Sequence, residues 1–186
     1  MRPPHRVLAL CGSLRARSIN AALLRAASRL APQGMTVAVF DHLGRLPLFN
    51  PDLEADTPEP VQHLHAQVSQ AAALLIASPE YAHGVTGTIK NALDWLVSFE
   101  DFVHKPVAVW NASPRAHHAD DALRETLKTM SADLVEHASI TLPLLGAHLD
   151  EAGMLASSTV APAIRDGLLQ LQRHLDGEPG PAFGGL

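Results

Sequence analysis

The chain has 186 residues, of which 47% are hydrophobic and 18% charged, and its formal net charge is -5. This composition is typical of one globular domain with a substantial core, and it excludes a disordered chain. The acidic balance argues against a nucleic-acid binder, and the single cysteine excludes an internal disulfide framework. The sequence has neither a signal-peptide pattern nor an apolar run of membrane-spanning length, so we expect a cytoplasmic protein without membrane contact.

Five apolar segments of strand length alternate with helical patterns along the chain. The expected strands are 7–11, 35–40, 71–77, 106–110 and a fifth within 134–142. Five helices are expected: the first starts at Asn20, the second runs over 59–70, the third follows Thr88, the fourth carries Leu123 to Met130, and the last runs over 161–175. This alternation predicts an α/β fold: a doubly wound, five-stranded parallel sheet in the order 2-1-3-4-5 with helices on both faces. We expect one domain over 1–186, with a loose lead-in over 1–5 and a flexible tail over 176–186.

Three polar loops follow the first, third and fourth expected strands, over 12–20, 79–88 and 111–120. In this strand order the carboxyl ends of these strands border the ligand crevice. The connection 44–52 is rich in turn residues, but its Leu46, Leu48 and Phe49 are too apolar for a free linker. We therefore expect that connection to pack over an edge of the domain.

The first loop has the chemistry of a phosphate site. A buried strand ends at Gly12, and a polar turn leads to a helix N-terminus, where unpaired backbone N–H groups and the helix dipole favour an anion. Ser13, Ser18 and Asn20 add neutral donors, and Arg15 adds a forked cation. The glycine patterns that hold pyrophosphates are absent, so the pattern favours a single phosphate. Ser18 as a simple helix cap with a solvated Arg15 is the alternative that this loop leaves open.

The second loop could hold the edge of a flat ligand. Pro79 stiffens the exit from the third strand, and Gly84 and Gly87 let backbone approach a ring closely. Tyr81 or His83 would line the side of that ring. An ordinary strand-to-helix turn with an exposed tyrosine and histidine explains the composition equally well.

Several motifs together carry a family resemblance. They are Gly12-Ser13-Leu14-Arg15 with Ser18 and Asn20, Leu46-Pro47-Leu48, and Pro79-Glu80-Tyr81 with Gly87, Lys90-Asn91 and Asp94-Trp95. Over about 6–175 the chain resembles the NADPH-dependent FMN reductase family, whose flavodoxin-like fold also serves quinone, azo-dye and chromate reductases. The resemblance implies FMN as cofactor, NADPH or NADH as electron donor, and a hydride transfer to the flavin before electrons leave to a quinone-like or other soluble acceptor.

The resemblance also implies the cofactor site and the assembly. The implied FMN-binding residues are Ser13, Arg15, Ser18, Ile19, Asn20, Pro79, Glu80, Tyr81, Ala82, His83, Gly84 and Ser113. The phosphate is assigned to the first loop, and the flavin ring to Pro79 to Gly84. Because the flavin carries the chemistry, no side chain is named as a catalytic acid or base. Relatives of this kind self-associate, so we expect a homodimer or homotetramer.

The chain departs from the family pattern in two loops. Ala82 and Gly84 stand where the family usually has Asn and Ser, and Thr86 replaces a proline. The third loop usually has small residues where this chain has Pro114, Arg115 and the pair His117-His118. We expect these changes to affect the use of the electron donor more than the binding of FMN.

Two other functions stay open at this point: a flavodoxin-like electron carrier without its own NAD(P)H turnover, and a flavin-free binding module on the same fold. A carrier would more naturally have a strongly acidic docking face than a net charge of -5. The eleven histidines do not have zinc-site spacing, so we expect no metal. Cys11 is expected to be a packed, inert thiol, and Trp95 and Phe99 to pack in the core or at a subunit contact.

Overall fold

The computed structural model describes residues 3–147 and 149–178. Its five-stranded parallel sheet has the order β2-β1-β3-β6-β7, which confirms the expected order 2-1-3-4-5. The strands are β1 (His5–Cys11), β2 (Met35–Phe40), β3 (Ala73–Ala77), β6 (Pro106–Trp110) and β7 (Asp133–Leu134). A separate antiparallel hairpin consists of β4 (Glu80–Tyr81) and β5 (Gly84–Val85).

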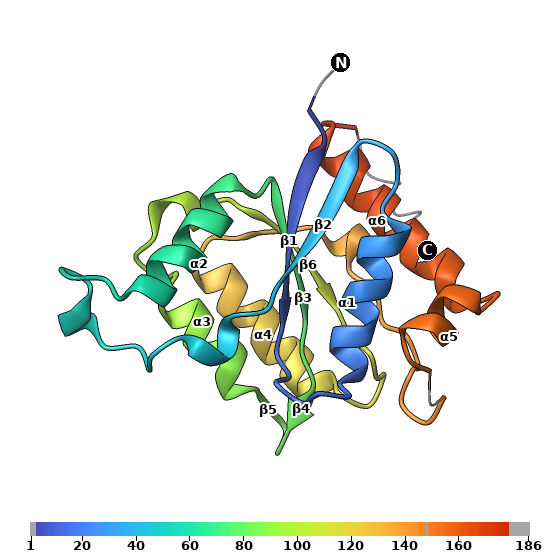
Figure 1. The fold of residues 1–186 in the computed structure, drawn as a ribbon, viewed down its shortest axis with the longest axis horizontal. Coiled ribbons are helices and arrows are strands. Elements are labelled where there is room, and N and C mark those ends of the chain that lie inside the picture. Colours follow the sequence, from blue (N-terminus) through green and yellow to red (C-terminus); the bar gives the residue numbers. More distant parts are fainter. Residues whose placement is uncertain (1–2, 148, 179–186) are drawn as a thin grey trace, which may run out of the picture.

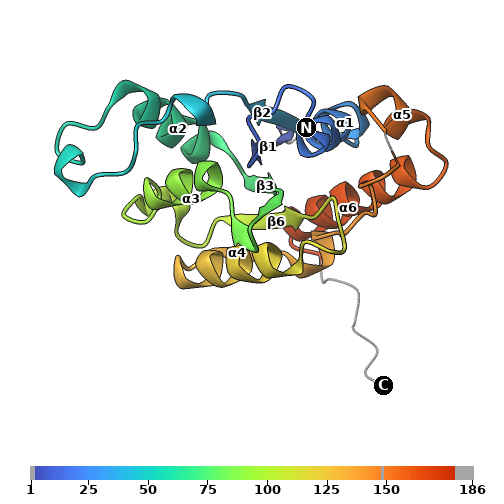
Figure 2. The same cartoon turned by 90° about the horizontal axis from the view of Figure 1, so that it is seen from below.

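Among the described residues, six α-helices cover the sheet in two groups, as Figures 1 and 2 show. They are α1 (Ile19–Leu30), α2 (Glu59–Gln70), α3 (Gly87–Asp94), α4 (His117–Thr129), α5 (Glu151–Ala156) and α6 (Val160–Leu175). Helices α1, α5 and α6 lie on one side of the sheet, and α2, α3 and α4 lie on the other, as the view in Figure 2 shows. Among the described residues, no helix is long and apolar enough to cross a membrane.

Alternate residues of the central strands serve the two faces, as the two-residue period of a strand requires. Val7 and Ala9 pack with α1 and α6 in one core cluster, whereas Leu8 and Leu10 pack with α2 and α3 in the other. All four side chains are almost wholly buried. Because both faces are covered, β3 and the second half of β1 are wholly apolar, and the polar residues of the cleft come from the loops at the strand ends.

The connection 44–52 packs against α3, as expected. The side chain of Asn91 accepts a hydrogen bond from the Phe49 N–H at 2.8 Å and donates one to the Pro47 carbonyl at 3.0 Å. The Trp95 indole N–H donates to the same carbonyl at 2.8 Å, and the Phe49 ring packs edge-on against Trp95. Trp95 is therefore a core residue and a backbone anchor, but Leu48 is 83% exposed, so only part of this connection is buried.

The fifth strand was expected within 134–142, and β7 covers Asp133–Leu134, at the start of that range. It ends at Leu134, and a 3-10 turn over Glu136–Ala138 follows it. The hydroxyl of Ser139 accepts a hydrogen bond from the Val109 N–H at 3.0 Å, so a side chain replaces a ladder carbonyl there. Pairing resumes at Asn111, whose N–H donates to the Ile140 carbonyl at 2.8 Å.

The chain ends also differ from expectation. His5 already belongs to β1, and its Nε2 lies 2.9 Å from the Asp176 carboxylate. The expected lead-in therefore shortens to residues before His5. Of the expected tail 176–186, residues 176–178 follow α6 directly and residues 179–186 lie outside the described part.

Candidate functional site

A cleft of about 390 Å³ lies where β1, β3 and β6 end, within the usual size range of cofactor sites. The three polar loops meet there, as the strand order predicts. The cleft is lined by Ser13, Arg15, Arg17, Ser18, Ile19, Asn20, Ser78, Pro79, Glu80, Tyr81, Asn111, Ala112, Ser113, Arg115, Ala116 and Leu145. The lining includes every candidate residue except Ala82, His83 and Gly84, and for all the candidates contact with a flavin stays a prediction.

Gly12 lets the first two loops lie against each other. A Cβ at this position would lie 2.1 Å from the Ser78 Oγ and 2.8 Å from a side-chain carbon of Ile89 on α3. Real Cβ atoms do not approach so closely, so any side chain here would push β1 away from the second loop. Glycine is thus required by the close approach of these two segments and not by its backbone angles.

Ser18 caps α1: its Oγ accepts a hydrogen bond from the Ala21 N–H at 3.2 Å. The capping alternative is therefore correct for Ser18, and its hydroxyl hydrogen remains able to donate into the cleft. Within the described residues, the N–H groups of Ile19 and Asn20 have no acceptor. The Asn20 side chain is 3% exposed, and its Oδ1 has no partner there. Such a buried, unsatisfied group beside free N–H donors points to a polar ligand.

The cleft lining is electropositive. Arg15, Arg17 and Arg115 all line it and are exposed, and Glu80 is the carboxylate in the lining. Both carboxylate oxygens of Glu80 already have protein partners, the Ala119 N–H and the His83 ring. The uncompensated guanidinium groups therefore suit a ligand that carries phosphate.

The second loop forms a tight hairpin that the sequence did not predict. Its two turn residues, Ala82 and His83, have φ of +49° and +59°, the pattern of a type I′ turn. Residues other than Gly, Asn and Asp are strained in this left-handed region. The positive φ values lie at Ala82 and His83, and not at Gly84, so the glycine does not supply the turn.

Replacing Ala82 with Asn should relieve this strain. We expect Ala82→Asn to raise the free energy of unfolding by about 0.5–1 kcal/mol, because Asn tolerates a positive φ far better than Ala. Ala82→Val should instead lower it, since a β-branched residue is poorest at that φ. Urea titrations of the three proteins measure both signs, and an unstable Asn variant would contradict the turn assignment.

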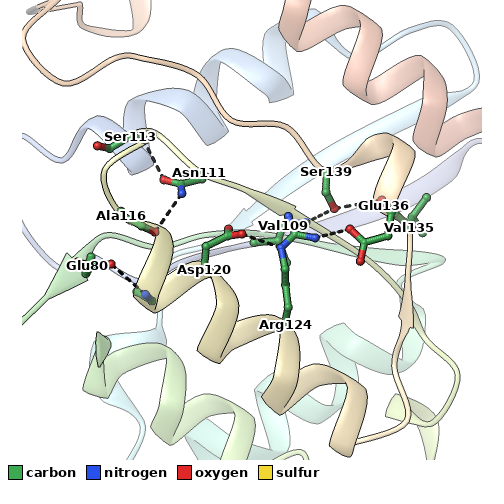
Figure 3. Close-up of polar contacts among 11 residues, drawn as sticks. Glu80, Val109, Asn111, Ser113, Ala116, Asp120, Arg124, Val135, Glu136 and Ser139 are labelled. Carbon is green, nitrogen blue, oxygen red and sulfur yellow. Dashed lines mark hydrogen bonds and ion pairs between the residues drawn. The ribbon is translucent and has the colours of Figure 1, made fainter. Parts of the chain in front are cut away.

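Glu80 fastens the hairpin to the first turn of α4 (Figure 3). Its Oε2 accepts a hydrogen bond from the Ala119 N–H at 2.9 Å, and its Oε1 lies 2.8 Å from the His83 Nδ1. The hydrogen bond from Ala119 is the main cause that lowers the pKa of Glu80, and the neighbouring His83 and His118 lower it further. The carboxylate therefore acts as a helix cap supplied by another loop.

Glu80→Gln should weaken this cap in a pH-dependent way. Because folding lowers the pKa of Glu80 below its ordinary 4.5, its ionised form stabilises the fold at neutral pH. That contribution is complete above 4.5 and is lost as the pH falls through the lowered pKa. We expect the Gln variant to be less stable than wild type at pH 7, with the difference shrinking below pH 4.5. Denaturant titrations at both pH values measure this.

The same substitution at Glu125, an exposed residue of α4, is the matched control. It should change stability little at either pH. A Glu80 difference that stays constant between the two pH values would contradict a role for the charge.

Asn111 organises the third loop from the end of β6. Its side-chain amide donates to the Ala116 carbonyl at 3.2 Å, and its Oδ1 accepts from the Ser113 N–H at 2.9 Å (Figure 3). Both Asn111 and Ser113 are buried. These hydrogen bonds therefore hold the third loop in one conformation where it lines the cleft.

An ion-pair network holds α4 in place behind this loop. The Arg124 Nε donates to the Asp120 carboxylate at 2.7 Å, and its guanidinium also pairs with Glu136 (Figure 3). These contacts join α4 to the turn after β7. They fix the helix whose first turn faces the hairpin.

The histidines of the third loop belong to α4. The expected loop extends to Asp120, but the helix begins at His117, so His117 and His118 lie on its first turn. The His118 ring centroid lies 4.1 Å from that of His117 and 4.6 Å from that of His83. Three imidazoles thus gather beside the cleft, although none of them lines it.

Other sequence expectations concern single side chains. Cys11 is buried, and this burial raises the pKa of its thiol, which makes it unreactive, as expected. Lys90 and Asp94 form the expected ion pair across one turn, at 2.5 Å. Phe99 lies beyond the end of α3 and stacks on His65 at 4.1 Å. Within 3–147 and 149–178, no three His, Cys, Asp or Glu side chains are grouped so that they could hold a metal.

Comparison with known proteins agrees with the resemblance. Residues 5–143 match the family model of NADPH-dependent FMN reductases. The chain belongs to this family. It is an NAD(P)H-dependent, FMN-containing oxidoreductase with a flavodoxin-like fold. Membership decides against the electron carrier without NAD(P)H turnover and against the flavin-free module.

Individual relatives cover most of the chain. An NAD(P)H-dependent FMN reductase of Pseudomonas aeruginosa is 33% identical over 173 residues, which are 90% of this chain and 93% of the relative. A quinone reductase of Escherichia coli is 35% identical over 111 residues, 58% of this chain and 59% of that protein. The solved flavoenzyme NAD(P)H:acceptor oxidoreductase of Paracoccus denitrificans has a TM-score of 0.82 and 26% identity, and covers 94% of this chain and 98% of its own.

The residues of the cleft fit FMN. The free N–H groups of Ile19 and Asn20 and the arginines suit a phosphate, and the unsatisfied Asn20 Oδ1 can accept a hydrogen bond from a hydroxyl of the attached chain. Seven lining residues were not among the candidates: Arg17, Ser78, Asn111, Ala112, Arg115, Ala116 and Leu145. Arg17 and Asn111 had a usable signal, since each lies in a loop at a strand end.

Proposed function

We propose that the cleft holds FMN with its phosphate at the N-terminus of α1 and its ring beside Pro79 and Tyr81. The free N–H groups of Ile19 and Asn20 at the start of α1 carry the phosphate assignment, and the buried Asn20 Oδ1, an acceptor without a donor, suits a hydroxyl group of the same ligand. Arg15 and Arg17 supply the opposite charge, and Ser13 and Ser18 supply hydroxyl donors. The β4–β5 hairpin and the third loop form the walls for the ring. Glu80 of the hairpin links the two, because its carboxylate accepts the hydrogen bond from the Ala119 N–H in the first turn of α4, which follows the third loop.

FMN, once bound, supplies the redox chemistry by accepting a hydride from NAD(P)H and passing electrons to an acceptor. The chain contributes binding and orientation through the loops that follow β3 and β6, which hydrogen bonds of Glu80 and Asn111 hold in place. We propose a quinone-like acceptor, because the Escherichia coli relative is a quinone reductase and exposed Tyr81 offers a flat apolar surface at the cleft.

The proposed activity has a direct kinetic test. FMN-loaded protein should oxidise NADPH rapidly when 2-methyl-1,4-naphthoquinone is present, and slowly when the quinone is left out. Flavin-free protein should be inactive with both substrates and regain activity when FMN is added. NADPH oxidation that does not respond to the quinone would contradict the acceptor assignment.

The histidines on the first turn of α4 should affect the binding of the electron donor NADPH. Replacing His117 and His118 with alanine preserves the helix and removes two imidazoles beside the cleft, so we expect a changed KM for NADPH. The affinity for FMN should change by less than about 1 kcal/mol, the scale of one neutral contact. Stopped-flow reduction and a flavin titration on the same variant separate these effects. Loss of FMN with unchanged donor kinetics would make this turn a flavin clamp.

We further propose that the chain self-associates as a homodimer or homotetramer and that it is cytoplasmic. Trp95 is buried and unavailable for a subunit contact, but Val97 is 62% exposed beside the Lys90–Asp94 ion pair. An apolar residue next to paired charges suits a self-complementary contact. Light scattering of the flavin-loaded protein tests this assembly, and a monomer at micromolar concentration would reject it.

A further inference from the structure

A segment beyond the family-matched region reaches the cleft. The match to the family model ends at residue 143, whereas Leu145 lines the cleft. The segment before it is fixed to the third loop: the Leu142 N–H donates to the Asn111 carbonyl at 2.8 Å, and the Leu144 N–H donates to the Ala112 carbonyl at 3.1 Å. Leu144 is 1% exposed and anchors the segment in the core.

A tight turn presents Leu145 to the cleft. The Ala147 N–H donates to the Leu144 carbonyl at 3.2 Å, and Gly146 has φ of +88°. This combination is that of a type II turn, with Leu145 as its first central residue and the glycine at the position that needs a positive φ. Leu145 is therefore held in one place although its side chain is 63% exposed.

Single exposed leucines are common on protein surfaces, but Leu145 has a specific setting. It shares the cleft with Tyr81, which comes from the β4 hairpin and is 59% exposed. The other exposed large side chains of the lining are arginines. Leu145 and Tyr81 are therefore the large, exposed apolar side chains of the lining, on two segments that hydrogen bonds hold in place.

We propose that Leu145 is a specificity-determining residue for the electron acceptor, which it selects by apolar contact with a flat, uncharged ring. This inference rests on the proposed function of the cleft. Leu145 touches the ring of a bound quinone and excludes water from its edge, while Tyr81 offers its own ring to the same compound. An acceptor that needs no apolar contact, such as ferricyanide, does not depend on Leu145.

The test compares Leu145→Ala, Leu145→Met and the control Leu48→Ala, which changes an 83% exposed leucine that does not line the cleft. With 2-methyl-1,4-naphthoquinone, Leu145→Ala should lower kcat/KM about five- to tenfold, mainly through KM, because part of a leucine side chain loses its contact. Leu145→Met should keep most of the wild-type kcat/KM for the naphthoquinone. In Leu145→Ala, the rate of ferricyanide reduction, the rate of flavin reduction by NADPH and the Kd for FMN should stay within twofold of the wild-type values.

A binding measurement supports the kinetics. Calorimetric titration of the oxidised, FMN-loaded protein with the same naphthoquinone should show a matching five- to tenfold loss for Leu145→Ala and none for Leu48→Ala. An equal loss with ferricyanide, or slower reduction by NADPH, would overturn the acceptor role. If wild type is reduced by NADPH and Leu145→Ala is unchanged with the quinone, this inference fails alone. If wild type is not reduced, the proposed function fails with it.

Discussion

Gly12→Ala is expected to lower the free energy of unfolding by about 1–3 kcal/mol, the usual cost of forcing extra volume into a packed site. The new methyl group would meet Ser78 and Ile89 at distances of 2.1 and 2.8 Å. Relief requires the end of β1 to move away from β3 and α3, which displaces Ser13 from the cleft. FMN affinity should therefore fall together with stability. Urea titration and flavin fluorescence on the same variant measure the two effects.

Gly87→Ala is the matched control, because Gly87 begins α3 and a Cβ there meets nothing within 4 Å. This substitution should leave stability unchanged or raise it by about 0.4–1 kcal/mol, since alanine restricts the unfolded chain. FMN binding should be unaffected. A Gly12 variant as stable as the Gly87 variant would show that the first two loops do not require their close approach.

Arg15→Ala is expected to weaken FMN far more than riboflavin. The charge-assisted contact it removes contributes about 1.5–3 kcal/mol, and riboflavin lacks the phosphate that makes it. The Kd for FMN should rise about ten- to hundredfold, while the Kd for riboflavin should change little. Arg17→Ala in the same titration shows how the two arginines of the cleft share the phosphate.

Arg29→Ala provides the control for charge alone. Arg29 is exposed in the last turn of α1, at the opposite end of the helix from the cleft. Its removal lowers the net positive charge of the helix without touching the loop, so both flavins should bind as in wild type. Equal weakening of FMN and riboflavin by Arg15→Ala would show that this residue does not hold the phosphate.

The sheet could be predicted because its signals are local. Continuous apolar runs identified the strands, and the polar residues after β1, β3 and β6 identified the edge with the cleft. The bounds of the fifth strand could not be predicted for a long-range reason: Ser139 replaces a ladder carbonyl on Val109, and no pattern in 134–142 shows this. The β4–β5 hairpin was missed because Ala82-His83 lacks the Asn-Gly signal of its turn.

The first loop of the site was predicted best, since its residues are contiguous and meet the helix they precede. The second and third loops depend on contacts between distant segments. Glu80 lines the cleft and its contact with the flavin stays a prediction, but no sequence signal showed that both of its oxygens contact protein groups, at Ala119 and His83. Leu145 had no signal in the sequence, because only the pairing of its segment with Asn111 and Ala112 brings it to the cleft.

Anaerobic mixing of the FMN-loaded protein with NADPH tests the central claim most directly. Flavin absorbance near 450 nm should bleach in a single turnover, and the bleaching should be lost when FMN is stripped from the protein and restored when FMN is added back. In the Arg15→Ala variant the same bleaching should require about ten- to hundredfold more FMN. A bound flavin that NADPH does not bleach would contradict the assignment of this cleft to NADPH-dependent flavin reduction.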